Sequence, residues 1–596
     1  MRKILISFVA ILLLLSLFSC ELPIPSTTTT TTTTNGSTTT STTITTINGG
    51  GNVDPDIVRF LTEVKASNEQ IVLTIDGTHS REYEVYYKKA TDDEYTKLDS
   101  NLMLEKEGII TAYILGISAG VYTVEVKAIG LGINVANDIT VYAQDRSGYA
   151  HFGATEGVGA YNNDGTVKKG TKIIYVTNEN KNTVTCEING TVYTGLVNIL
   201  QAQYKSDTPM LVRIIGKITT NQWNYKNVEP RLSDRSNATD DFFENTFSSE
   251  YGENLANLIV KINDKGDGKT YKYKTTPQGV ALESLRDGGT GTTTYKGSDF
   301  PELKGKTTFD DDSYYNMLEV KGSKNITIEG VGKDAEIFQF GIDFEESNNI
   351  EIKNLTFTGY PEDALSFRGD KREDLANYGR YWIHNCTFNR GYNAWDISGE
   401  RDKYAGDGSI DFNNISNLTL SYNYFNNCKK TMLFGSGDSE ACMNMTMHHN
   451  YFYQVESRLP LGRHTNIHSY NNYFVQCKNC HDIRVGSYLF SENNYFISTS
   501  KPFINSSSYI KSLGDKFVSS SNSGATIVTD RTKTLSGNCK PDKTNNLMNF
   551  DTNSSLFYYD SVNKKSDVAV MLSAMQVPAF VTKYAGAGKL EALVIE

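Results

Sequence analysis

One short aromatic pattern recurs through the second half of the chain. A Phe closes a tetrapeptide at positions 357, 388, 425, 452, 474 and 496, where the sequence reads NLTF, NCTF, YNYF, HNYF, NNYF and NNYF. The intervals between these Phe residues are 31, 37, 27, 22 and 22 residues. A recurrence of roughly 20–50 residues is typical of solenoids, in which each repeat packs on its neighbours. We therefore expect a stack of coils.

The residues between the repeats indicate which kind of solenoid forms. Short runs that alternate apolar and polar residues precede the Phe, as in NLTLS (417–421) and NMTMH (444–448), and no run of ten or more residues with helical period intervenes. Strands of about five residues joined by tight turns are typical of a parallel β-helix. Like residues should then stack on successive coils, which predicts a lumenal aromatic stack and a turn-satisfying amide ladder. The predicted members are Phe452, Phe474 and Phe496 for the stack and Asn450, Asn472 and Asn494 for the ladder.

The first residues have the layout of an export signal. Arg2 and Lys3 precede an apolar run over residues 4–18, and Leu17-Phe18-Ser19-Cys20 resembles a bacterial lipobox. We predict that residues 1–20 are a lipoprotein signal peptide ending at Cys20, which would carry the lipid. An ordinary signal peptide that happens to contain Cys20 is the alternative. The expected location is outside the cell, as a bacterial cell-surface or outer-membrane lipoprotein.

Three further segments follow from composition and patterning. Residues 21–54 are rich in Thr and Ser, too polar to bury a core, and should form a linker. Residues 55–145 alternate apolar and polar positions in short runs, which predicts a small β-sandwich similar to fibronectin type III or immunoglobulin-like modules. We favour spacing over carbohydrate binding for it, because the Trp residues lie elsewhere. Residues 146–596 should form the β-helix, so the predicted fold class is all-β.

Charge and cysteine content narrow the function. A net charge of −11 and a pI of about 5.4 argue against a nucleic-acid binder with a broad basic face. An anionic substrate would need a local cationic cleft or a bound cation. Of the 8 Cys, seven remain after Cys20, an odd number that cannot all pair within the chain. Burial as small apolar residues is the expected role, and Cys477-x-x-Cys480 lacks a second pair at zinc-site spacing.

Residues 404–496 carry the most specific motifs: GDGSIDFNN, KTMLFGSGD, NMTMHHNYF and RLPLGR. They resemble the pectate lyases of polysaccharide lyase family 1, and weaker matches extend the resemblance to about residues 148–596. The resemblance implies a right-handed parallel β-helix. It also implies Ca²⁺ as cofactor and α-1,4-polygalacturonate (pectin) as partner, cleaved by β-elimination to unsaturated oligogalacturonides. We expect a monomer that touches neither nucleic acid nor, except through its lipid, a membrane.

The resemblance also implies individual roles. In RLPLGR, Arg458 would be the catalytic base and Arg463 would grip the substrate, together with Lys430 of KTMLFGSGD. Arg484 would be a further substrate contact, although its match needs a one-residue gap. The Ca²⁺ ligands would be Asp363, Asp407 and Asp411.

The chain departs from the family pattern in two places. Pro361 stands where some relatives carry another Asp, so Glu362 or water would replace that ligand. Residues 368–380 look like an insertion before Trp382-Ile383-His384-Asn385, where the family has WIDH.

Other interpretations of the same residues exist. Standing alone beside Gly, Asp407 and Asp411 would cap turns, and Arg458 would be a surface residue. What favours function is their joint placement on successive coils. We interpret His448 and His449, at a strand end beside the Asn ladder, as structural.

Three alternative functions remain. A calcium-free pectin lyase is disfavoured by the carboxylates, and a paired-carboxylate hydrolase by the lack of a tight Asp cluster. A non-catalytic pectin-binding surface protein is the third. Because Arg normally keeps its proton, an Arg base predicts activity that rises toward alkaline pH.

Overall fold

The computed structural model describes residues 44–47, 58–80, 82–219, 259–264, 270–275, 285–286, 317–360, 362–391, 407–529 and 571–589. The predicted signal peptide, Cys20, Pro361 and Cys539 lie outside these ranges. The chain divides into two compact units, one of Met1–Leu115 with Ala119–Tyr142 and one of Gly116–Ser118 with Ala143–Glu596. Within the described ranges, no helix is long and apolar enough to cross a bilayer.

The first unit consists of two antiparallel sheets. One has the order β1 (Ile44–Ile47), β9 (Gly132–Val141), β8 (Gly120–Ala128), β4 (Tyr83–Lys89), β5 (Thr96–Lys97). The other has the order β2 (Leu61–Ala66), β3 (Gln70–Asp76), β7 (Ile109–Leu115), β6 (Met103–Lys106). Alternation along β8 buries every second side chain, including Val124 and Val126. The antiparallel strands agree with the expected sandwich, whereas its likeness to fibronectin type III stays a prediction.

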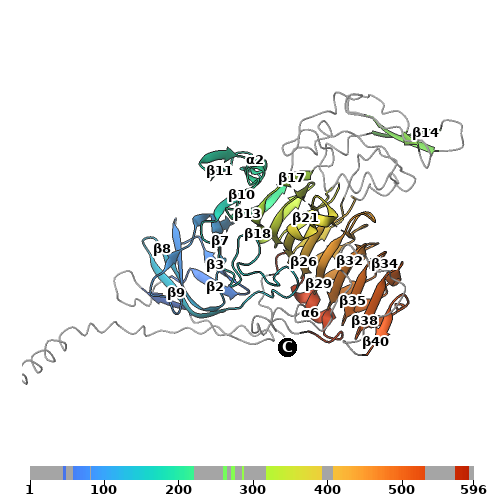
Figure 1. Cartoon of the computed structure of the whole chain (residues 1–596). Helices are drawn as coiled ribbons and strands as arrows, with labels where there is room; N and C mark the ends of the chain where they lie inside the picture. Colours follow the sequence, from blue (N-terminus) through green and yellow to red (C-terminus); the bar gives the residue numbers. More distant parts are fainter. Residues whose placement is uncertain are drawn as a thin grey trace, which may run out of the picture. The chain divides into compact units, whose positions relative to one another are not determined.

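The second unit is built on two long sheets of parallel strands, stacked in Figure 1 from yellow-green to red. The sheet of eight has the order β17 (Met317–Lys321), β19 (Gly341–Glu345), β22 (Leu365–Arg368), β25 (Ile410–Asn413), β28 (Met432–Phe434), β31 (Leu461–Gly462), β34 (Asn479–Ile483), β37 (Lys501–Asn505).

The sheet of eighteen is longer because seven successive coils contribute two strands each, which lie a few residues apart in the sequence. Its order is β10 (Lys172–Val176), β13 (Met210–Thr219), β18 (Lys324–Phe338), β20 (Asn348–Lys353), β21 (Thr356–Thr358), β23 (Gly379–His384), β24 (Thr387–Asn389), β26 (Ile415–Ser421), β27 (Tyr424–Asn426), β29 (Cys442–His448), β30 (Tyr451–Tyr453), β32 (Thr465–Tyr470), β33 (Tyr473–Val475), β35 (Tyr488–Glu492), β36 (Tyr495–Ile497), β38 (Tyr509–Leu513), β39 (Lys516–Val518), β40 (Thr526–Val528). Strands of one coil pair with those of the next, as β29 does with β32 and β30 with β33. Parallel crossovers of this kind are right-handed. The predicted right-handed parallel β-helix is confirmed.

Smaller elements flank the coils. They are the β11 (Thr185–Ile188) and β12 (Thr191–Thr194) pair, the sheet of β14 (Ile259–Asp264), β15 (Thr270–Thr275) and β16 (Leu285–Arg286), and the helices α2 (Leu196–Gln201) and α6 (Val577–Tyr584). The expected insertion at 368–380 includes the 3-10 turn η5 (Arg372–Asn377), which lies between β22 and β23. α6 buries Val577 and Val581 beside the Tyr residues that begin β30, β33 and β36.

The lumen contains the predicted aromatic stack. The rings of Phe452 and Phe474 lie 4.8 Å apart between centroids, and those of Phe474 and Phe496 lie 4.6 Å apart, both nearly parallel. The stack continues to Phe357 in one direction and to Phe517 in the other. Each of these short strands buries its central residue, so in-register pairing places Phe on Phe at every coil.

The amide ladder is also confirmed. The backbone N–H of Asn450 donates to Asn472 Oδ1 at 2.9 Å, and that of Asn472 donates to Asn494 Oδ1 at 2.7 Å. Asn423 extends the ladder by one coil, and Asp515 accepts from the backbone of Asn494 at its end. These side chains satisfy buried turn N–H groups that no strand partner reaches. Six cysteines lie buried as free thiols, as expected: Cys186, Cys386, Cys428, Cys442, Cys477 and Cys480.

Candidate active site

The eight-stranded sheet carries the predicted site on its outward face. In β25, Ile410 and Phe412 are buried in the lumen, so the intervening Asp411 points to the other side of the sheet. Asp411 pairs in register with Ser366 of β22 and Leu433 of β28. The turns that lead into these strands lie at the same edge of the sheet, because the strands are parallel.

Three carboxyl groups gather at this edge. The backbone N–H of Gly408 donates to Asp363 Oδ1 at 2.7 Å. A Cβ atom at Gly408 would lie 2.7 Å from Asp363 Oδ1 and 2.9 Å from Asp411 Oδ1, so both carboxyl groups approach the same backbone position. The backbone N–H of Asp407 donates to the Glu362 carbonyl at 3.1 Å, which ties the two turns together.

The electrostatics of the cluster favour a bound cation. Burial, followed by repulsion from Asp411 and Glu362, raises the pKa of Asp363 well above its usual value. Burial and the Asp407 carboxylate raise the pKa of Asp411 to about 7, although Arg458 and Lys430 oppose the increase. Carboxylates held together against their own repulsion offer the hard oxygen ligands that Ca²⁺ prefers. The residues present therefore fit a calcium ion, and the charge of Glu362 acts on both Asp363 and Asp411.

Two cations follow on the next coils. Lys430 Nζ donates to Asp407 Oδ1 at 2.6 Å, a pair in which both side chains are largely buried. Lys430 also forms a parallel bridge with Ser457, the residue before Arg458, and Met432 N–H donates to the Arg458 carbonyl at 2.8 Å. Coil stacking thus places Arg458 one coil beyond Lys430, where its charge acts on Asp411.

Arg458 differs from the other cations in two respects. Its backbone has a φ of 63°, in the left-handed region that costs a non-glycine residue about 1–3 kcal/mol and is concentrated at functional sites. Within the described part of the chain, its guanidinium makes no hydrogen bond or ion pair. The half-buried Arg458 side chain is therefore available to a ligand.

Arg463 and Arg484 extend the row of basic side chains that begins with Lys430 and Arg458. Arg463 Nη1 donates to the carbonyls of Gly435 and Ser436, each at 3.1 Å. Arg484 makes a two-point contact with Asp482, from Nε to Oδ1 at 3.1 Å and from Nη2 to Oδ2 at 2.7 Å. Burial and the nearby charges of Arg484 and Arg458 lower the pKa of Arg463, which indicates three guanidinium groups in one region.

The structure therefore brings the seven predicted site residues of the β-helix onto consecutive coils. The carboxylates lie at β22 and β25, and the cations at β28, β31 and β34. Sequence reasoning missed the acidic partners of the arginines. The contact between Asp482 and Arg484 could have been predicted from the sequence, because residues two apart in a strand point to the same face of the sheet. The contact between Asp438 Oδ1 and Arg463 Nε, at 3.6 Å, could not have been predicted, because Asp438 lies in a loop.

Fold and site together define a parallel β-helix protein with a cluster of buried carboxyl groups beside a row of basic side chains on one sheet. Comparison with known proteins makes the family specific. Residues 298–590, just under half of the chain, match the model of the pectate lyase family.

The relatives found are curated bacterial pectate lyases. Pectate lyase 1 of Pectobacterium atrosepticum is 33% identical over 157 residues, which is 26% of this chain and 40% of that protein. The pectate lyase of Bacillus subtilis is 32% identical over 169 residues, which is 24% of this chain and 39% of that protein. The chain thus spans about 40% of the length of the first relatives it matches. A crystal structure of a Bacillus sp. N165 pectate lyase with trigalacturonate is 21% identical with a TM-score of 0.41, covering 74% of this chain and 99% of that one.

Proposed function

We propose that the chain is a calcium-dependent pectate lyase that cleaves polygalacturonate by β-elimination. The observation that carries the proposal is the adjacency of a carboxylate cluster and a cationic row along one parallel sheet. Strands of such a sheet are about 4.8 Å apart, so the row extends along the coil axis as a linear polymer would. An acidic protein can bind an acidic polymer in this way because its positive charge is local.

Asp363, Asp407 and Asp411 would hold Ca²⁺, with Glu362 as a further oxygen donor. Calcium bound there would draw charge from a substrate carboxylate and so stabilise the anion that forms when C5 loses its proton. Lys430 is already paired with Asp407 and would turn toward the substrate once the carboxylate ligates the ion.

Arg463 and Arg484 would orient the carboxylates of neighbouring sugars. The Nε and Nη2 atoms of Arg484 are held by Asp482, which fixes the plane of the guanidinium and leaves Nη1 for a ligand. Arg463 is anchored through Nη1 on backbone carbonyls, its Nε lies 3.6 Å from Asp438 Oδ1, and Nη2 would contact the substrate. Both side chains are positioned before substrate arrives, which lowers the entropy cost of binding.

Arg458 would act as the base. It takes the C5 proton, the C5–H electrons form the C4–C5 double bond, and the C4–O bond breaks with its electrons on the leaving oxygen, which receives a proton from solvent. The guanidinium must lose a proton first, so the reaction should accelerate toward alkaline pH.

We further propose that residues 1–20 direct export and that lipid on Cys20 anchors the protein at the bacterial cell surface or outer membrane. The basic residues, apolar run and lipobox-like segment support this. Residues 21–43, which precede β1, and the antiparallel unit would then space the enzyme, as a monomer, from the membrane, whereas residues 44–47 of the predicted linker form β1 of that unit. Recovery of the full chain in the aqueous phase of a detergent partition, equally for the wild type and C20A, would contradict the anchor.

The decisive experiment follows product formation. With polygalacturonate and Ca²⁺, the full chain should generate the ultraviolet absorbance of unsaturated uronides, and a chelator should abolish it. A pectin lyase would instead prefer methyl-esterified substrate and ignore the chelator. A non-catalytic pectin-binding protein would bind polygalacturonate without any absorbance change. Either of the last two results overturns the proposal.

A further inference from the structure

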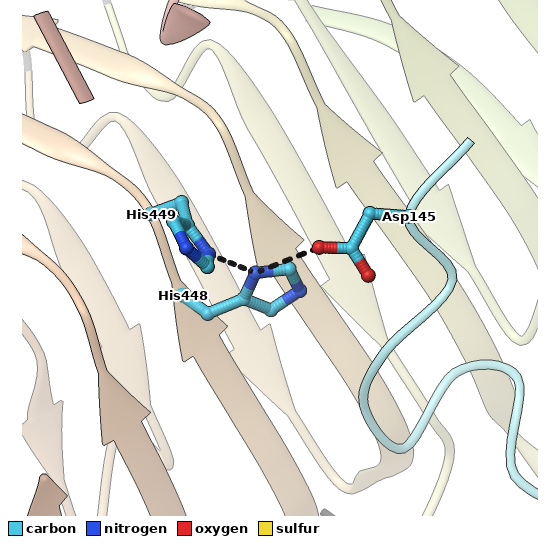
Figure 2. A group of neighbouring side chains, drawn as sticks. All are labelled: Asp145, His448 and His449. Atoms are coloured by element: carbon cyan, nitrogen blue, oxygen red, sulfur yellow. Dashed lines mark hydrogen bonds and ion pairs between the residues drawn. The ribbon is translucent and has the colours of Figure 1, made fainter. Parts of the chain in front are cut away.

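A second cluster of ligand-type side chains lies on the eighteen-stranded sheet, away from the sheet that carries the candidate active site. His448 ends β29, His449 follows it, and Asp145 comes from the segment before β10. Figure 2 shows both imidazoles and the carboxylate converging. His448 Nδ1 lies 2.9 Å from His449 Nδ1 and 3.9 Å from Asp145 Oδ2, and one ligand atom from each residue lies within 4.8 Å of the others. The three residues are buried.

Hydrogen bonds determine which ring nitrogens face the cluster as lone pairs. His448 Nε2 lies 3.3 Å from the Ser147 carbonyl, which can only accept, so Nε2 carries the proton. The Nδ1 atom of His448 is then an acceptor, and His449 Nδ1–H donates to it. A single proton therefore occupies the space between two nitrogens. A backbone carbonyl that fixes the tautomer of a histidine is the usual support of a metal ligand.

Hydrogen bonds also orient the Asp145 carboxylate toward His448. Ser147 donates to Asp145 Oδ1 from its backbone N–H at 3.0 Å and from its hydroxyl at 2.6 Å. Asp145 Oδ2 accepts from the Tyr422 hydroxyl at 2.7 Å and faces His448. One oxygen is thus tied to its own turn, and the other points inward.

In this hydrogen-bond pattern His448 and His449 each carry one ring proton and the Asp145 carboxylate only accepts, so the buried cluster holds one negative charge. Two neutral imidazoles and one carboxylate are a donor set with a charge that a cation would balance.

We propose that Asp145, His448 and His449 bind a structural divalent metal of the zinc type, which replaces the proton shared by the two Nδ1 atoms. Zinc bonds of about 2.0–2.2 Å in a tetrahedron separate the ligand atoms by about 3.3–3.6 Å. The observed 2.9 Å and 3.9 Å bracket this separation, and the third pair of ligand atoms lies within 4.8 Å, so the side chains would draw together around the metal. On binding, the His449 proton leaves Nδ1 and Nε2 takes up a proton, so both imidazoles remain neutral ligands. Imidazole ligands select zinc over the calcium that suits an all-oxygen cluster.

The position of the cluster explains what the metal would do. Asp145 belongs to a segment whose next residues dock on the sheet: Tyr149 N–H donates to Thr446 Oγ1 and Ala150 N–H to Thr419 Oγ1. On the other side, the His449 ring lies 5.3 Å from that of Phe580 in α6. A metal here would pin this segment to the coils beneath α6. Because the site is closed, the metal would enter during folding and exchange slowly.

The test measures metal content and stability of the full chain. Protein expressed with added zinc and then dialysed against a chelator with excess calcium is analysed by mass spectrometry for metals. We expect close to one zinc per chain in the wild type and in H468Q. His468 is also fully buried and binds a carboxylate, that of Glu492 at 3.0 Å, so it is a matched control outside the cluster. H448Q and H449Q should lose the zinc.

Two further measurements keep the result clear if a variant folds poorly. Zinc should raise the melting temperature of the wild type and of H468Q but not that of H449Q. Wild-type protein expressed with Co²⁺ should show the intense visible bands of a tetrahedral nitrogen and oxygen site, which an all-carboxylate site does not produce. Wild type without zinc, equal zinc in all four proteins, or Co²⁺ bands of six-coordinate type would each overturn the proposal.

Discussion

Calcium binding should weaken as pH falls through neutrality, because protons compete for the carboxylates. Without a cation the pKa of Asp411 is about 7, so the side chain is about nine-tenths ionised at pH 8 and about one-tenth ionised at pH 6. If Ca²⁺ binds the ionised form, its apparent affinity drops about tenfold over this interval. The pKa of Asp363 is also raised, and release of a second proton would bring the decrease toward a hundredfold.

Isothermal titration calorimetry of the full chain with Ca²⁺ at pH 6, 7 and 8 measures this decrease. Repeating the titration in buffers of different ionisation enthalpy counts the protons released. D411N should bind Ca²⁺ weakly and lose most of the pH dependence, whereas the exposed Asp334→Asn should match the wild type. Constant affinity between pH 6 and 8 would refute the reasoning, as would Ca²⁺ binding without proton release at pH 7.

The same carboxylates link pH to stability. The folded-state pKa of Asp411 is raised from 3.8, so in the absence of calcium its contribution to stability is fully present below about pH 4. That contribution is lost as pH rises through about 7. Calcium should therefore raise the melting temperature more at pH 8 than at pH 6.

Three substitutions probe other parts of the structure. R458A should lower kcat by about 10²–10⁴, whereas R59A in the first unit should keep the full rate. An R458A enzyme of near wild-type rate would remove Arg458 as base. G408A would place a Cβ 2.7 Å from Asp363 Oδ1 and should weaken calcium binding at least tenfold. G437A is the control, because a Cβ at Gly437 would meet nothing closer than 3.7 Å. Equal calorimetric titrations of the two variants would contradict the close approach at Gly408. N472A leaves the Asn450 N–H without its acceptor and should lower the free energy of unfolding in urea by about 1–3 kcal/mol. The half-buried control Asn389→Ala should lower it by less than about 1 kcal/mol. An unchanged unfolding midpoint in N472A would show that the ladder contributes little.

The coil architecture was predictable because its information is local. Phe474 stacks on Phe496, and Asn472 bonds Asn494, since the 22-residue interval between the last repeats places like residues in register on adjacent coils. A strand of five residues needs only its own alternation to decide which side chains enter the lumen. The sequence alone therefore determined the solenoid, its core and the order of the coils.

The charged partners depended on the tertiary structure. The sequence pattern and family motifs placed Asp363, Asp411 and Arg458 on neighbouring coils. It took the fold to show that Gly408 lies between two carboxyl groups and that Asp438 reaches Arg463 from a loop. Asp145 gives no sign in the sequence of meeting His448 about three hundred residues later. Such contacts arise because a solenoid and the segments docked on it bring distant residues together, and short-range patterns carry no record of that approach.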